Sequence, residues 1–309
     1  MSTVAIVMAT YNGEKYVGEQ IESILASCYQ EFELFIYDDG SKDNTLSILL
    51  DYERHYPGKL HVYRNEVNLG VTLNFLNALT RTTMDYVMFC DQDDVWKTNK
   101  IAVTLKRMRH MEAQIGKEKP LAVFTDAIVA DKELKVLRNS FFCSNHLNPR
   151  RTDLAHILME NKLIGCTVMV NNALRNVLRS RQLPGHARYH DWWVALIAAS
   201  MGKIGYVNEG TLFYRQHGEN VVGGTDFFSY MKNRVSVLGK QKEVIRSLYA
   251  QAEEFIMLYD TLLPREKAEL IRRFAGLGQY NFIRRRIIIL HYGYLKTGII
   301  RNIGLFFII

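Results

Sequence analysis

The residues best able to do chemistry in this 309-residue sequence are three carboxylates within four positions, Asp91, Asp93 and Asp94. They directly follow the mostly apolar run 86–90, which has the composition of a strand covered on both faces. Like charges repel one another and cannot be buried without partners, so packing gives no reason to place them together. A divalent cation bound together with a phosphate would account for the cluster.

The elements that position this cluster alternate between strand and helix. Apolar runs predict strands at residues 4–9, 34–37, 60–63, 86–90 and 121–124. Helices are predicted between them from apolar residues at helical spacing, and Asp43 is the expected N-cap of one. The alternation predicts an α/β fold, Rossmann-like, with a mostly parallel central sheet and helices on both faces.

The polar residues after successive strands are expected to meet at one edge of that sheet. In such folds ligands bind at the carboxyl ends of the strands. The residues in question are Thr10, Tyr11 and Asn12 after the first strand, Asp38 and Asp39 after the second, and the acidic cluster after the fourth. The sequence contains no G-x-G-x-x-G and no G-x-x-x-x-G-K-[ST] motif. A bound nucleotide diphosphate would therefore be neutralised by Mg²⁺ or Mn²⁺ held on carboxylates.

Further candidate residues lie downstream of the predicted sheet core. Gly165 lies in the apolar run 164–170, read as a strand, and permits close approach of backbone or substrate. Asp191 is near the start of a helix that runs to about residue 201, where it could act as a cap. The neighbouring Trp192 and Trp193 favour instead a pocket wall, because aromatic rings suit the apolar faces of sugars, although Trp is more often buried packing.

Two short strands, at 204–207 and 211–214, are expected to lead into a polar segment. In it, His217 is a candidate third metal ligand or phosphate donor, and Arg215 a candidate phosphate or acceptor contact. A lone histidine is more often structural, so this assignment depends on the surrounding site.

Charge and composition divide the chain into an acidic front and a basic tail. Residues 1–100 carry 8 Lys/Arg and 15 Asp/Glu, whereas residues 227–309 carry 14 Lys/Arg and 6 Asp/Glu. This asymmetry does not suit a uniform nucleic-acid-binding surface. We expect a catalytic domain over 1–225 and a helical, basic region over 226–309. The tail is expected to lie on an anionic membrane surface, with a helical cap packed on the main domain as the alternative. Four dispersed cysteines suit a reducing cytosol.

Taken together, the motifs resemble a known enzyme family. Residues 5–13 (AIVMATYNG), 37–41 (YDDGS) and 89–96 (FCDQDDVW) are similar to the inverting family 2 glycosyltransferases of GT-A fold. The resemblance extends over roughly residues 1–225. Residues 165–171 (GCTVMVN), 190–193 (HDWW) and 214–217 (YRQH) look like the bacterial rhamnosyltransferases that build cell-wall polysaccharides. The Q-x-x-R-W segment of processive members is absent, which implies transfer of one or a few sugars.

This resemblance implies a role for each matched residue. Thr10, Tyr11 and Asp39 would hold a pyrimidine base, with Asn12 beside them. Asp91 would meet the ribose or a metal-bound water, Asp93 the metal, and Asp191 would be the catalytic base. The implied donor is dTDP-β-L-rhamnose, the acceptor a lipid-linked saccharide, and the location the inner face of a bacterial plasma membrane.

Three alternatives stay open at the level of sequence. The donor could be another sugar nucleotide such as a UDP-sugar. A nucleotidyltransferase would also use sheet-edge carboxylates and a metal, but it would want a glycine-rich and basic loop after the first strand. A non-catalytic sugar-nucleotide-binding membrane scaffold would not need the acidic cluster together with Asp191.

Overall fold

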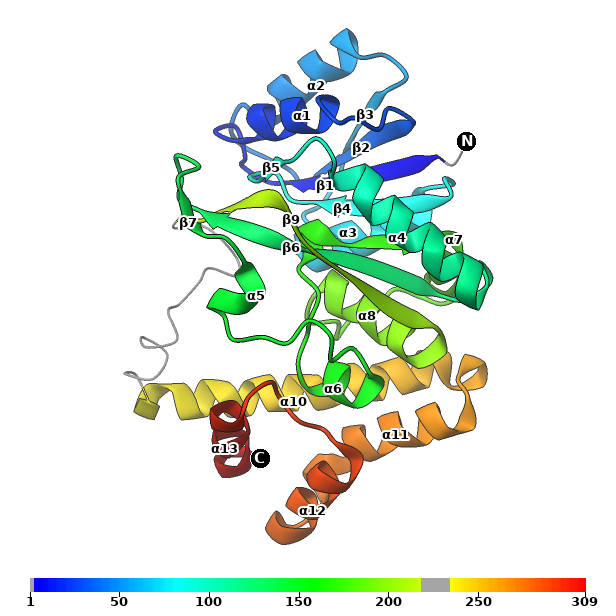
Figure 1. The fold of residues 1–309 in the computed structure, drawn as a ribbon, viewed down its shortest axis with the longest axis vertical. Coiled ribbons are helices and arrows are strands. Elements are labelled where there is room, and N and C mark those ends of the chain that lie inside the picture. Colours follow the sequence, from blue (N-terminus) through cyan, green and yellow to red (C-terminus); the bar gives the residue numbers. More distant parts are fainter. Residues whose placement is uncertain (1–2, 218–233) are drawn as a thin grey trace.

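The computed structural model describes residues 3–217 and 234–309. For residues 234–238 and 240 it describes the backbone alone. These residues form a twisted nine-stranded sheet with helices on both faces, and a group of helices from the C-terminal part lies below it (Figure 1). The expected boundary between 225 and 226 lies outside the described residues. The predicted α/β architecture, with a central sheet, helices on both of its faces and helices at the C-terminus, is confirmed.

The N-terminal half alternates strand and helix as predicted. Its elements are β1 (Val4–Thr10), α1 (Val17–Leu25), β2 (Phe32–Asp38), α2 (Thr45–His55), β3 (Leu60–Arg64), α3 (Gly70–Arg81) and β4 (Tyr86–Cys90). The strands pair in parallel in the order β3-β2-β1-β4. Thr10 lies opposite Asp38, and Met8 lies opposite Cys90. The polar residues that follow these strands therefore leave the sheet at the same edge.

The second half of the sheet departs from the simple parallel pattern. It contains β5 (Val95–Trp96), α4 (Lys100–Ile115), β6 (Leu121–Ala130), β7 (Val136–Arg138), α5 (Phe141–Ser144), α6 (Leu154–Met159), the 3-10 turn η1 (Gly165–Thr167), β8 (Met169–Asn171), α7 (Asn172–Arg179), α8 (His190–Met201) and β9 (Lys203–Arg215). β8 lies between β4 and β6 and is antiparallel to both. β6 and β9 pair in parallel over most of their length.

Three sequence expectations are corrected here. The run 164–170 is a 3-10 turn followed by a short strand, not one strand. The two strands expected at 204–207 and 211–214 are one long strand, β9, whose pairing with β6 shifts register around Asp126. Asp43 is not the N-cap of α2, which is Asn44; its carboxylate accepts instead from the Thr45 N–H (3.0 Å) and the Glu14 N–H (3.1 Å).

The core consists of two hydrophobic clusters, one on each face of the sheet. In β1, Val4, Ile6 and Met8 belong to one cluster, and Ala5 and Val7 belong to the other. This alternation is what a fully covered parallel strand requires, because successive side chains point to opposite faces.

The C-terminal elements are α10 (Arg234–Tyr259), η2 (Asp260–Leu262), α11 (Arg265–Ala275), η3 (Gly276–Gln279), α12 (Phe282–Tyr292) and α13 (Ile299–Ile308). α10 runs beneath α6 and α8 (Figure 1), and its Phe255 packs edge-on against Trp193 at 5.3 Å between ring centroids. Its buried residues share one hydrophobic cluster with α8. Across the described residues, no helix combines the length and the apolar character that crossing a membrane would need.

Candidate active site

Two hydrogen bonds join the loop after β1 to the acidic turn after β4. The Tyr11 N–H donates to Gln92 Oε1 at 2.9 Å, and Gln92 Nε2 donates back to the Tyr11 carbonyl at 3.1 Å. Asn12 adopts a left-handed φ of 49°, a conformation that asparagine tolerates better than most residues. Its side chain accepts from the Lys42 N–H at 2.9 Å, which joins the loop to the one after β2. The convergence of three strand ends is therefore a set of direct contacts.

Asp38 and Asp39 hold the second loop in different ways. Thr10 Oγ1 donates to Asp38 Oδ1 at 3.1 Å. Asp39 is almost fully buried, and its carboxylate accepts three hydrogen bonds of 2.8 Å, from Asn65 Nδ2 and from the N–H groups of Leu69 and Gly70. Three donors leave part of its acceptor capacity unused. The contact of Asp39 with a base N–H stays a prediction.

The three clustered carboxylates lie in unequal environments. Asp94 is only 1% exposed, and its Oδ1 accepts from the Arg215 N–H at 3.2 Å, so it anchors β9 and does not cap α4. Burial, together with Asp93 and Asp91, raises the pKa of Asp94 well above its usual range. Burial, with Asp93 and Asp191 adding to it, raises the pKa of Asp91 to about 7. The charged forms of these carboxylates are therefore destabilised, and a bound cation would stabilise them.

Lys100 is a buried charged residue near the acidic cluster that the sequence reasoning missed. Its side chain is fully buried, and burial lowers the pKa of its ammonium group to about 8, although nearby Asp94 and Asp91 act in the opposite direction. Nζ contacts Thr211 Oγ1 at 3.5 Å and lies 4.6 Å from the Trp96 ring centroid. Lys100 begins the buried face of α4, so a lysine at core spacing was the available signal.

The structure brings His217 and Asp93 together, as the metal hypothesis requires. His217 Nε2 lies 2.8 Å from Asp93 Oδ2, and its ring stacks on Tyr16 at 5.0 Å. Carboxylate oxygens and an imidazole nitrogen form a donor set suited to Mn²⁺ or Mg²⁺. The residues present therefore fit a divalent cation next to a phosphate.

A second group of potential ligand atoms lies deeper, on Asp91, Asp94 and Cys166, all within 4.8 Å of one another. Burial raises the pKa of the Cys166 thiol well above its usual range, which favours the protonated form. A protonated sulfur is a poor ligand for a hard cation. Asp93 and His217, whose ligand atoms lie 2.8 Å apart, are therefore the better candidate pair among the described residues, and the assignment of Asp91 to the same ion stays a prediction.

Asp191 lies on the first turn of α8, with Tyr189 at the N-cap position, so it is not the helix cap. Burial raises its pKa to about 7, although hydrogen bonds from the Trp192 N–H, the Asn161 side chain and the Gly165 N–H act in the opposite direction. The charge of Asp191 also raises the pKa of Asp91. The predicted base is thus next to the acidic cluster, although they are about 100 residues apart in sequence.

Gly165 lies where η1 closely approaches two side chains of α8, and its predicted role at the acceptor or phosphate stays a prediction. A Cβ at this position would lie 2.8 Å from His190 Nε2 and 3.7 Å from Asp191 Oδ2. His190 cannot easily move, since it stacks on Phe75 at 4.0 Å and meets Phe89 edge-on at 4.9 Å. Burial lowers the pKa of His190 to about 3, so the ring is neutral at physiological pH.

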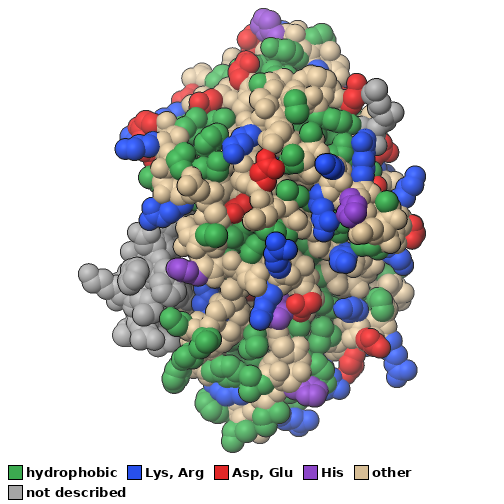
Figure 2. Space-filling model, viewed as in Figure 1, with side chains coloured by type: hydrophobic (Ala, Val, Ile, Leu, Met, Phe, Trp, Pro, Cys, Tyr) green, Lys and Arg blue, Asp and Glu red, His purple; other side chains and the backbone are tan. Residues whose placement is uncertain are grey.

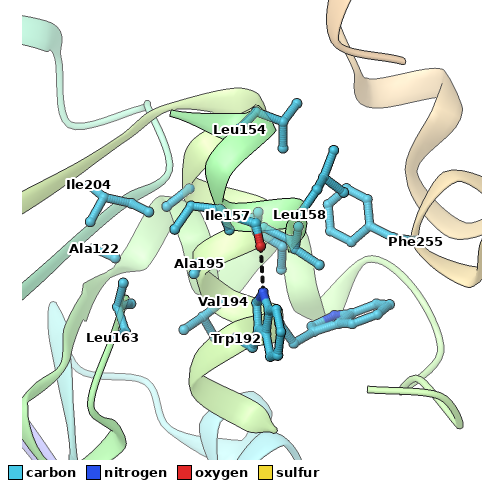
Figure 3. Packing of buried hydrophobic residues seen from close by; sticks show 14 of the residues in the cluster. Ala122, Leu154, Ile157, Leu158, Leu163, Trp192, Val194, Ala195, Ile204 and Phe255 are labelled. Atoms are coloured by element: carbon cyan, nitrogen blue, oxygen red, sulfur yellow. Dashed lines mark hydrogen bonds between the residues drawn. The ribbon is translucent and has the colours of Figure 1, made fainter. Parts of the chain in front are cut away.

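Three residues predicted to line the site are instead buried and bound to other parts of the fold. Trp192 is buried, and its Nε1 donates to the Ile157 carbonyl at 2.6 Å (Figure 3). Trp193 is fully buried against Phe255 and Tyr259, so neither ring forms an acceptor wall. Arg215 is 3% exposed and is engaged by the Asp93 carbonyl (2.8 Å), the Lys132 carbonyl (2.6 Å) and Glu19, which leaves it positioning the acidic turn.

Helix α10 also holds the loop that leads into α8. Glu254 on α10 accepts from the N–H groups of Gly185 (2.8 Å) and His186 (2.6 Å). Gln251 Oε1 accepts from the Arg188 N–H at 2.9 Å. These contacts fix the loop that leads into α8 and Asp191, a link that no local sequence pattern could indicate.

Comparison with known proteins agrees with this geometry. The model of glycosyl transferase family 2 matches residues 5–116, which contain the β1, β2 and β4 loops. The dTDP-rhamnosyl transferase RfbG of Shigella flexneri is 25% identical over 262 residues, covering 80% of this chain and 85% of its own length.

Solved structures share the fold at lower identity. Staphylococcus aureus TarS 1–349 in complex with UDP-GlcNAc matches with a TM-score of 0.57 and 17% identity, covering 93% of this chain and 79% of that one. The Pyrobaculum calidifontis mannosyltransferase PcManGT, in complex with GDP-Man and Mn²⁺, matches with a TM-score of 0.52 and 13% identity, covering 95% and 84%. Residues 5–116 of the chain thus match the glycosyl transferase family 2 model, and the chain shares the fold of these solved structures.

Proposed function

We propose that this protein is a metal-dependent inverting glycosyltransferase that moves one sugar from a nucleotide donor to a lipid-linked saccharide. The observation that carries this proposal is the proximity of the buried Asp191 carboxylate to the Asp91–Asp94 cluster, with the pKa of both Asp191 and Asp91 raised to about 7. A donor phosphate site and a general base would then lie on either side of one reaction centre.

Asp191 is the proposed catalytic base. Its carboxylate accepts the proton of the acceptor hydroxyl as that oxygen attacks the anomeric carbon, and the nucleoside diphosphate leaves from the opposite face. Configuration therefore inverts. A pKa of about 7 matches a general base to neutral pH, where the deprotonated form is populated and still basic enough to take a proton.

Asp93, Asp91 and His217 are the proposed metal ligands. Bound there, Mg²⁺ or Mn²⁺ would neutralise charge on the leaving diphosphate, a contribution that is usually a large share of the lowering of the barrier. On the protein side, Arg215 and Gln92 keep the ligand-bearing turn in place through their contacts with Asp93 and Tyr11.

The proposed donor is dTDP-β-L-rhamnose, which would give an α-L-rhamnoside. Support comes from the likeness to RfbG, whose name states dTDP-rhamnosyl transfer, over most of both chains. A UDP-sugar is the alternative, because TarS shares the fold and was solved with UDP-GlcNAc. Thr10, Tyr11, Asn12 and Asp39 are the proposed nucleotide contacts in either case.

The proposed acceptor is membrane-bound, and the C-terminal helices are proposed to contact an anionic membrane at the inner face of the plasma membrane. Large apolar side chains of α12 and α13 are exposed by 50% to 80%: Phe282, Ile283, Ile287, Leu290, Ile299, Ile300, Ile303 and Phe307. Figure 2 shows hydrophobic side chains gathered at the end of the molecule where Figure 1 places these helices. Residues 280–309 contain five Lys/Arg and no Asp/Glu, which favours anionic lipid headgroups.

The test is Asp191→Asn assayed against a panel of sugar nucleotides, including dTDP-rhamnose, UDP-glucose and UDP-GlcNAc. Transfer of labelled sugar into solvent-extracted bacterial lipid should fall by about 10²–10⁴-fold, while donor affinity measured by calorimetry is unchanged. Asp51→Asn, an exposed carboxylate on α2, is the matched control. Equal loss of donor binding and transfer would assign Asp191 a structural role. Donor binding by the wild type without any transfer would favour the scaffold alternative.

A further inference from the structure

A buried ionic network joins α13 to the loop 160–165, which packs against the first turn of α8. Glu160 lies at its centre, pairing with Lys162, whose side chain is fully buried, and with Arg301 NH1 at 3.0 Å. Lys162 Nζ also donates to Thr297 Oγ1 at 2.6 Å, and the Thr297 N–H donates to Glu160 Oε2 at 2.8 Å. Arg301 reaches further, to the Asn145 carbonyl at 2.7 Å. A single glutamate therefore binds two residues of the C-terminal segment.

The other end of this network is the catalytic base. Asn161 directly follows Glu160, and Gly165, at the end of the same loop, lies against the first turn of α8, where a Cβ on it would be 2.8 Å from His190 Nε2 and 3.7 Å from Asp191 Oδ2. Asn161 also closes a local turn, through Nδ2 to the Leu163 carbonyl and from the Leu163 N–H to Oδ1, both at 3.0 Å. The segment 160–165 is thus a short, hydrogen-bonded connection between Glu160 and Asp191.

The inner and outer faces of α13 have different partners. Arg301 of α13 and Thr297, just before the helix, face Glu160, whereas Ile299, Ile300 and Ile303 of α13 are 80%, 56% and 50% exposed. The exposed residues belong to the surface proposed to contact the membrane. Contact of these exposed side chains with a membrane would therefore also restrain Thr297 and Arg301, because both sets of residues lie within the short segment 297–303.

We infer that Glu160 is a positioning residue that couples contact of α13 with an anionic membrane to the placement of Asp191. The inference rests on the proposed transfer to a membrane-bound acceptor. Membrane contact holds Thr297 and Arg301, and these hold Glu160 and Lys162. The loop 160–165 then holds the first turn of α8, which carries Asp191, through the close approach of Gly165 to His190. The acceptor half of the site is in this way most ordered where the acceptor is found.

The experiment measures hydrogen–deuterium exchange of peptides covering 160–167, with and without vesicles of phosphatidylcholine and phosphatidylglycerol. Vesicles should slow exchange in the wild type. The paired variant Glu160→Gln/Lys162→Met removes both buried charges, so that neither is left unpaired. It should still sediment with vesicles but lose the vesicle-dependent protection. Glu133→Gln, whose side chain is exposed, is the matched control and should behave as the wild type.

Thr297→Val is the second variant, because it removes one hydroxyl partner of Lys162 and keeps the ion pairs of Glu160. It should weaken the vesicle-dependent protection of residues 160–167. If the paired variant shows no folded melting transition, Thr297→Val alone tests the inference. Ile299→Asp should lose vesicle binding and protection together while donor affinity is kept. Full protection in both network variants, or none in the wild type, would overturn the inference. Sugar transfer by the wild type is measured separately, so a failure here is distinguishable from failure of the proposed function.

Discussion

Replacing Gly165 by alanine should separate catalysis from donor binding. The added Cβ would lie 2.8 Å from His190 Nε2 and 3.0 Å from its Cε1, closer than ordinary van der Waals contact. His190 is enclosed by Phe75 and Phe89, so the ring can yield only by shifting the first turn of α8. That turn carries Asp191, and the substitution therefore acts on the proposed base while the donor loops lie on other elements.

The expected losses of stability and rate follow from the overpacking at residue 165. Forcing one methyl group into a close-packed site costs about 1–3 kcal/mol, which for a chain of this size lowers the melting temperature by about 2–4 °C for each kcal/mol. A misplacement of about 1 Å at a catalytic group can cost on the order of 100-fold in rate. We expect Gly165→Ala to remain folded and to lose about that factor in kcat, with donor affinity unchanged.

The assay compares kcat for sugar transfer, donor affinity by calorimetry and the melting temperature in one series. Gly185→Ala is the control, because the nearest atom to its added Cβ, Glu254 Oε1, lies at an ordinary 3.7 Å in the loop before α8. An unchanged kcat in Gly165→Ala would refute the argument that η1 sets the position of Asp191. A loss of donor affinity equal to the loss of kcat would also refute it.

Three further results are expected. The rate at saturating substrate should rise with pH around an apparent pKa of about 7, because burial raises the pKa of Asp191 and only the deprotonated form accepts a proton; a profile flat through neutrality would contradict this. His217→Ala should weaken Mn²⁺ binding, measured by calorimetry with nucleoside diphosphate, by on the order of 10-fold or more, and the exposed His110→Ala should not. Trp193→Ala should lower the free energy of unfolding by about 3–5 kcal/mol in chemical denaturation with donor affinity kept; weakened donor binding with little loss of stability would restore a role in the site.

The donor half of the site was predictable because local patterns encode it. Apolar runs such as Tyr86–Cys90 predict buried strands, and the residues that follow parallel strands must meet at one edge of the sheet. Strand direction is not encoded locally, which is why the antiparallel β8 was not expected. The polar stretch 208–210 resembled a turn, yet pairing with β6 carries β9 through it.

The acceptor half depended on contacts between distant segments. The exposure of Trp192 and Trp193 is decided by Ile157 and by α10, about 60 residues downstream of the pair. Two adjacent tryptophans beside an acid therefore suited a sugar site and a core equally well. The position of Asp191 was predictable as a helix start, but its proximity to Asp91 was a consequence of the resemblance and of the fold.

The hydrogen bonds between α10 and the loop before α8 have a consequence for protein engineering. Glu254 and Gln251 accept from three backbone N–H groups of that loop, those of Gly185, His186 and Arg188, and Phe255 covers Trp193. A truncation that ends before α10 would remove these partners and expose a large aromatic face. Chimeras meant to exchange acceptor specificity between relatives should therefore move residues 154–201 together with 239–309 as one cassette, and leave the first 116 residues in place.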